Sequence, residues 1–125
     1  MAKKFLIDTN VLIDAQRKIL PRTGSLFLKQ IIDKEFIISF VTYIEVLGYK
    51  AATPSMEEFI SLATVLEIDK SIINASISIR KNHNIKLPDV IIAATALVND
   101  YTLITRNTSD FKGIKNLQTI NPYKL

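Results

Sequence analysis

Short apolar runs rich in β-branched and aromatic residues alternate along the chain with segments whose apolar positions recur at helical spacing. The short runs predict strands at 4–7, 36–40, 64–68, 101–105 and 117–120. The helical spacing predicts helices at 11–17, 25–33, 43–51, 54–62, 70–82 and 88–98. Strands that alternate with helices favour an α/β fold around a mostly parallel sheet.

Local signals place several boundaries of these elements. Thr53 followed by Pro54 is typical of a helix start, and Pro88 opens a later helix in the same way. Pro21 and Gly24 are predicted to break the chain between the first two helices.

Acidic and amide side chains follow the ends of the predicted strands. Asp8 directly follows the first strand, and Glu45 lies near the start of the helix after the second. Asp89 opens the helix that leads into the fourth strand, and Asn107 and Asp110 follow that strand. Because the carboxyl ends of parallel strands share one edge, where ligands bind, we expect these side chains to lie close together.

Each of these side chains also has a purely structural explanation. Asp8 would help to cap the helix that follows it, and Thr42 with Glu45 has the spacing of a capping box. Asp89 in a first helical turn is favoured by the helix dipole. The segment 107–110 resembles a cap followed by an acid. Caps do not need to be acidic, however, so the set as a whole favours a shared chemical role.

The chemistry of such a cluster favours a hard cation. Close carboxylates do not readily all ionise unless a positive charge lies between them. The chain has no Cys and one His, His83 in a polar loop, so zinc is disfavoured and Mg²⁺ or Mn²⁺ is predicted. Carboxylates around such an ion suit phosphodiester hydrolysis.

Length, charge and composition limit the class of protein. The 125 residues, without an internal repeat or linker, fit one domain, 1–125. A net charge of +4 is a mild bias towards polyanions. The absence of Cys excludes disulfides and cysteine catalysis and is compatible with a cytoplasmic location. The apolar stretches are too short to span a membrane, and the first is interrupted by Asp8, unlike a signal peptide.

Four segments that carry these acids resemble the motifs of PIN domains. They are 6–13 (LIDTNVLI), 39–46 (SFVTYIEV), 87–96 (LPDVIIAATA) and 103–111 (LITRNTSDF), in the family's order and over nearly the whole chain. The size and motif style are most similar to the VapC-type toxins of bacterial and archaeal toxin–antitoxin pairs.

The resemblance implies a three-layer α/β sandwich with a mostly parallel, four- or five-stranded sheet and helices on both faces. It also implies a metal-dependent endoribonuclease that uses Mg²⁺ or Mn²⁺. Asp8 and Asp89 match the principal metal ligands, and Glu45 matches the acid that completes the site, directly or through water. Asn10 would orient the ligand carboxylates, and Thr105 matches the hydroxyl residue at the strand end.

The fourth motif departs from the pattern of some relatives, which have Asp at the position of Asn107. An amide is neutral and cannot act as a base, which puts a second metal site in doubt. Asp110 would substitute for it, or would only support the loop.

The hypothesis for the mechanism begins with one Mg²⁺ on Asp8 and Asp89 contacting the scissile phosphate. Glu45, with or without Asp110, would position or deprotonate the attacking water, leaving a 5′-phosphate and a 3′-hydroxyl. Phosphate contacts are predicted at Arg80, Lys81, Lys86, Arg106 and Lys112, although each would equally suit an ordinary solvated surface charge.

The resemblance implies two protein partners. One is an antitoxin whose C-terminal segment lies across the acidic crevice, placing a basic side chain among the carboxylates. The other is a second copy of the chain, in a homodimer through helical surfaces. The apolar residues Ile72, Ile73, Ile77 and Ile79 would be core or interface, with core favoured.

Two other functions are considered. A phosphoryl-accepting receiver domain needs paired acids after the first strand, whereas Asp8 is followed by Thr9 and Asn10. A PIN-fold interaction module without catalysis remains an alternative because of Asn107, although Asp8, Glu45 and Asp89 argue against it.

Overall fold

The computed structural model describes residues 3–125 and contains every strand and helix that the pattern predicts. The strands are β1 (Phe5–Ile7), β2 (Ile37–Ser39), β3 (Thr64–Leu66), β4 (Thr102–Ile104) and β5 (Thr119–Ile120). The helices are α1 (Thr9–Gln16), α2 (Arg22–Lys34), α3 (Phe40–Leu47), α4 (Pro54–Ile60), α5 (Lys70–Asn82), α6 (Leu87–Asn99), α7 (Thr108–Phe111) and the 3₁₀ helix η1 (Pro122–Lys124). Within residues 3–125, no helix is both long enough and apolar enough to cross a membrane.

The strands pair in parallel, as predicted, but in two groups. One has the order β1-β4-β5, with Leu6 beside Leu103, and the other pairs β2 with β3. β1 and β2 lie in contact, yet within residues 3–125 no ladder of hydrogen bonds joins them. The seam between β1 and β2 therefore joins the two groups, and Leu6 with Ile37, and Ile7 with Ile38, belong to shared apolar clusters across it.

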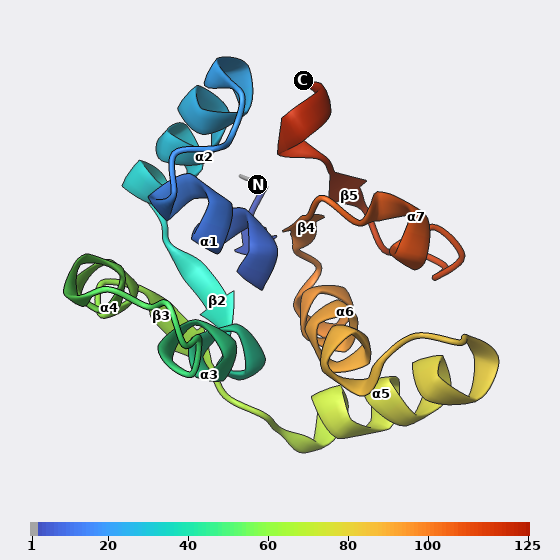
Figure 1. The fold of residues 1–125 in the computed structure, drawn as a ribbon. Helices are drawn as coiled ribbons and strands as arrows, with labels where there is room; N and C mark the ends of the chain where they lie inside the picture. The colour runs from blue at the N-terminus through green and yellow to red at the C-terminus, as the bar shows by residue number, and fades with distance from the viewer. Residues whose placement is uncertain (1–2) are drawn as a thin grey trace.

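Helices cover both faces of the strands, which confirms the α/β architecture (Figure 1). Successive strand residues point to opposite faces. Leu6 and Leu103 belong to an apolar cluster with residues of α5, α6 and α7. Their neighbours Ile7 and Ile104 belong to a second cluster with residues of α1, α2 and α4.

Three predicted helix starts are late by two or three residues, and one of them is that of α1, which begins at Thr9 and not at Val11. α2 begins at Arg22, so Gly24 lies inside the helix and does not break it. α3 begins at Phe40, directly after β2, where the Ser39 hydroxyl accepts a hydrogen bond from Val41 N at 2.9 Å. The apolar run that predicted a strand up to Phe40 therefore contains the strand's end and the first residue of the next helix.

The glycine in α2 is explained by a close approach of the C-terminal segment. A Cβ atom at Gly24 would lie 1.9 Å from the carbonyl oxygen of Pro122, which is part of the η1 backbone. α2 and η1 pack directly against each other. Position 24 therefore requires the smallest residue, although its helical geometry would suit others.

Replacing Gly24 by Ala should destabilise the protein because the added methyl group would displace the η1 backbone. Overpacking of this kind costs about 1–3 kcal/mol in the free energy of unfolding, which urea titration measures. The matched control is Gly113→Ala, whose Cβ would meet only His83 ring atoms at 3.6 Å. That control should change the free energy by less than about 0.5 kcal/mol. Equal effects of the two substitutions would contradict the explanation.

The apolar residues of α5 divide between core and surface. Ile72 and Ile79 are buried, as predicted. Ile73 and Ile77 are 43% and 50% exposed, so the preference for core was wrong for these two. They line an apolar groove beside Leu87 at the start of α6.

Candidate acidic metal site

Asp8 connects the ends of two strands. It follows β1 and caps α1, and its Oδ1 accepts a hydrogen bond from Thr9 N at 2.8 Å. Its Oδ2 accepts a hydrogen bond from the Thr105 hydroxyl, also at 2.8 Å, at the end of β4. The side chain therefore caps a helix, as its structural explanation expected, and is also held from across the sheet. Only 3% of Asp8 is exposed.

Glu45 is held beside Asp8 by a neighbouring hydroxyl. Thr9 donates a hydrogen bond to Glu45 Oε1 at 2.5 Å, and the hydroxyls of Thr9 and Thr42 are hydrogen-bonded at 3.1 Å. Because Ser39 caps α3, the capping-box explanation of Thr42 and Glu45 is wrong. Thr9 and Thr42 were missed as positioning groups, although Thr9 adjoins Asp8 and Thr42 precedes Glu45 by about one helical turn.

A pocket of ≈ 440 Å³ lies at this edge of the sheet. Its walls are formed by Asn10, Glu45, Asn84, Ile85, Lys86, Pro88, Asp89, Asn107 and Asp110. Five residues predicted for the site, from α1, α3, α6 and the segment after β4, therefore share one pocket, whereas the buried Asp8 is not among the residues that line it. Asn84 was not singled out by the sequence; it precedes α6 in the loop that also carries Lys86.

The carboxylates of the site repel one another. The pKa of Asp8 is raised from 3.8 to about 6, chiefly by burial, although the hydrogen bonds from Thr105 and Thr9 oppose the rise. The negative charges of Asp89 and Glu45 raise it further. The site therefore carries more negative charge than its surroundings neutralise.

The pKa of Asp89, which lines the pocket, is raised as well. Burial raises the pKa of Asp89 most, and the charges of Glu45 and Asp110 raise it further, against an opposing effect of Lys86. The repulsion connects the four acids in steps, since the pKa of Asp8 responds to Asp89 and Glu45, and the pKa of Asp89 responds to Glu45 and Asp110.

The donor set fits Mg²⁺ or Mn²⁺ in a partly hydrated form. In the part of the chain that the structure describes, no three Asp, Glu or His side chains form a ready-made ligand group. Mg²⁺ usually keeps several waters and needs only one or two protein carboxylates. Asp8 and Asp89 offer two, and the excess negative charge around them would be relieved by a cation.

Sequence comparison identifies the family. The family model of the PIN domain matches residues 5–117 of this chain. The chain belongs to the PIN-domain family. No curated protein matches it.

Solved structures place this PIN domain beside bacterial toxin–antitoxin proteins. A chain of a toxin–antitoxin complex from Klebsiella pneumoniae is 33% identical, with a TM-score of 0.75, over 98% of this chain and 100% of that chain. A chain of DNA-bound VapBC from Salmonella typhimurium is 22% identical, with a TM-score of 0.78, over 97% of this chain and 99% of that chain. A chain of VapBC-1 from nontypeable Haemophilus influenzae is 24% identical, with a TM-score of 0.78, over 96% of this chain and 98% of that chain. The two VapBC matches support the fold alone, and at the level of the fold the predicted resemblance to VapC-type PIN domains is confirmed.

The basic residues predicted to contact phosphate lie in different parts of the PIN domain. Lys86 lines the acidic pocket. Arg80 and Lys81 line the apolar groove of α5. Arg106 is paired with an acid of α1, and Lys112 follows α7 as an exposed residue. Lys86 is therefore the candidate contact nearest to the carboxylates.

Proposed function

We propose that this PIN domain is a metal-dependent endoribonuclease that cleaves phosphodiester bonds of RNA. The observation that carries the proposal is the acidic cluster, in which the charges of Asp89 and Glu45 raise the pKa of Asp8, and those of Glu45 and Asp110 raise the pKa of Asp89. Such a repulsive cluster has a chemical use when it holds a cation beside a bound phosphate.

The residues would divide the work of the site. Asp8 and Asp89 would hold Mg²⁺ or Mn²⁺, which when bound polarises a phosphoryl oxygen and lowers the pKa of a coordinated water. Thr105 keeps the Asp8 carboxylate fixed through its hydroxyl. Asn10, in the pocket wall, would orient the ligand carboxylates. Lys86 would contact a phosphate of the RNA.

Glu45 is the proposed base for the attacking water. Thr9 fixes one carboxylate oxygen, which leaves the other free to take the proton of water. The water oxygen would bond to phosphorus as the bond to the 3′-oxygen breaks, leaving a 5′-phosphate and a 3′-hydroxyl. Asp110 lies in the same pocket and would assist, whereas Asn107 would donate or accept hydrogen bonds without taking a proton.

The proposal extends to a toxin of a toxin–antitoxin pair that acts in the cytoplasm. The names of the similar structures, which include toxin–antitoxin and VapBC complexes, support this role. An antitoxin segment with a basic side chain would complement the acidic pocket. A homodimer would cover the exposed Ile73 and Ile77 of α5.

Cleavage of a mixed RNA pool by the purified protein tests the function. We expect cleavage with Mn²⁺ or Mg²⁺, no cleavage with EDTA, and products that carry 5′-phosphates. Binding of Mn²⁺ without cleavage of any RNA would instead support the alternative, a PIN-fold interaction module without catalysis.

Replacing Thr9 by Val should lower kcat about tenfold, because the outer hydrogen bonds that orient active groups typically contribute this much. The valine removes the hydroxyl that holds Glu45 while keeping the shape of the side chain. Initial rates over a range of RNA concentrations separate kcat from KM. Thr9→Ser, which keeps a hydroxyl, should retain most of the activity. Equal losses in both variants would show that the hydroxyl is unimportant.

A further inference from the structure

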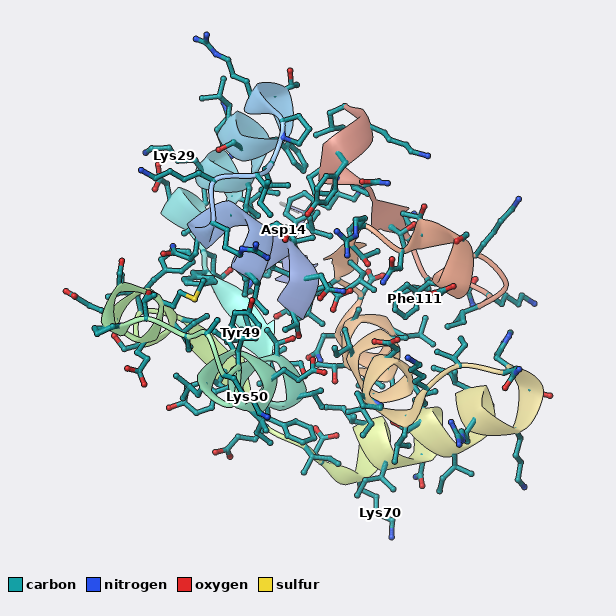
Figure 2. The ribbon with its side chains drawn as sticks, in the orientation of Figure 1. Asp14, Lys29, Tyr49, Lys50, Lys70 and Phe111 are labelled. Atoms are coloured by element: carbon teal, nitrogen blue, oxygen red, sulfur yellow. The ribbon has the colours of Figure 1, made fainter. Side chains whose placement is uncertain are left out.

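A second group of polar side chains lies outside the acidic pocket, where α1 meets the C-terminal segment (Figure 2). Asp14 of α1 is only 8% exposed, and it accepts a hydrogen bond from the Tyr123 hydroxyl. Arg106 donates to Asp14 Oδ2 at 3.2 Å, and its guanidinium lies 5.6 Å from the centre of the Tyr123 ring. We call Asp14, Arg106 and Tyr123 the Asp14 cluster.

Arg106 is held at its backbone as well as at its side chain. Asn121 donates a side-chain hydrogen bond to the Arg106 carbonyl at 3.3 Å and accepts one from Tyr123 N at 2.9 Å. The preceding residue, Thr105, donates its backbone N–H to Ile120 O at 3.0 Å. The segment 120–123 therefore fixes the chain directly after β4.

The two neighbours of Arg106 belong to the acidic site. Thr105 donates its hydroxyl to Asp8 Oδ2 at 2.8 Å. Asn107 lines the pocket and donates its backbone N–H to the Thr105 hydroxyl oxygen at 3.1 Å. In the turn 105–107, the middle residue therefore belongs to the Asp14 cluster, while Thr105 holds Asp8 and Asn107 lines the acidic pocket.

We propose that the Asp14 cluster positions the turn 105–107, so that Asp14 and Tyr123 control the orientation of the Asp8 carboxylate without touching it. The inference rests on the proposed function and assigns positioning residues to the same site. A hydroxyl fixes a carboxylate only if its own backbone is fixed, and the contacts to Arg106 provide that restraint.

The geometry favours positioning over a simple gain in stability. The Arg106 side chain is 49% exposed and that of Asp14 is 11% exposed, so water at the guanidinium weakens the contribution of this ion pair to folding. Tyr123→Phe removes the hydroxyl that bonds to Asp14 but keeps the ring beneath the guanidinium. The variant should therefore fold while releasing part of the restraint on the turn.

Amide hydrogen exchange of Asn107, followed by NMR, tests the link to the turn without reference to catalysis. We expect exchange about tenfold faster in Tyr123→Phe and in Asp14→Asn than in the unmodified protein. Tyr101→Phe, at the other end of β4, is the matched control and should leave this exchange unchanged. Unchanged exchange of Asn107 in both cluster variants would overturn the proposal.

Mn²⁺ binding, followed by the electron paramagnetic resonance of free Mn²⁺, and RNA cleavage test the consequence for the site. We expect Tyr123→Phe to weaken Mn²⁺ binding and to lower kcat, each about tenfold, with little change in KM. Values within twofold of the unmodified protein, together with a lower urea midpoint, would reveal a purely structural cluster and overturn the proposal. If the proposed function is wrong, the unmodified protein will neither bind Mn²⁺ nor cleave RNA. In that case the amide exchange of Asn107 still decides whether the cluster holds the turn.

Discussion

Replacing Asp8 by Asn will lower the rate of RNA cleavage on the order of 10³-fold, the scale at which preorganised charge acts in active sites. The carboxylate is the group held most firmly in the site, by Thr9 and Thr105, and the variant replaces its charge with a neutral amide. Asn caps helices as well as Asp does, so α1 should keep its start. Asp89→Asn should have a comparable effect.

Initial rates with a labelled RNA in Mn²⁺ measure this loss, and circular dichroism checks that the variants fold. Asp100→Asn is the matched control because it makes the same chemical change far from the pocket. Asp100 is exposed and has a left-handed backbone with φ of 57°, a conformation that Asn tolerates well. Cleavage at the normal rate by folded Asp8→Asn would remove this carboxylate from the mechanism.

The stability of the metal-free protein should fall as pH rises through the range in which Asp8 loses its proton. The pKa of this carboxyl is raised from 3.8 to about 6 in the folded state, mainly by burial. The folded state therefore binds the proton more tightly than the unfolded state does. The resulting stability is fully present below about pH 4 and is lost by about pH 6, on the order of 3 kcal/mol.

Urea unfolding in EDTA at several pH values isolates this effect as the difference between the unmodified protein and Asp8→Asn. Relative to the variant, the unmodified protein should lose stability between about pH 4 and pH 6. Excess Mn²⁺ at pH 7.5 should stabilise the unmodified protein, because a ligand that binds only the folded state adds to its stability. A difference between the two proteins that stays constant with pH would contradict the buried, proton-binding carboxyl.

The order and type of the elements could be predicted because hydrophobic periodicity depends on local sequence. Helix boundaries could not always be predicted, since contacts remote in sequence decide them. Gly24 predicts a break when only its neighbours are considered, but its small size is required by Pro122 at the other end of the chain. Similarly, the apolar run 36–40 continues across the boundary between β2 and α3, and only Ser39, the polar residue that caps α3, marks it.

The acids of the site could be predicted from topology alone. Asp8, Glu45 and Asp89 follow or precede strands whose ends must meet in a parallel sheet, and the structure places them within electrostatic reach of one another. Their partners could not be predicted in this way. Arg106 was predicted as a phosphate contact or a solvated surface charge, whereas the structure shows it in an ion pair with Asp14, from a distant part of the chain.

The seam between β1 and β2 separates Glu45 from the aspartates. In sequence, β2 and β3 lie between β1 and β4, which pair with each other in the other group of strands. The hydrogen bond from the Thr9 hydroxyl of α1 to Glu45 connects the segment from β2 to β3 with α1. The spacing between the proposed base and Asp8 is therefore set by packing and by the Thr9 hydrogen bond, and not by a ladder of backbone hydrogen bonds.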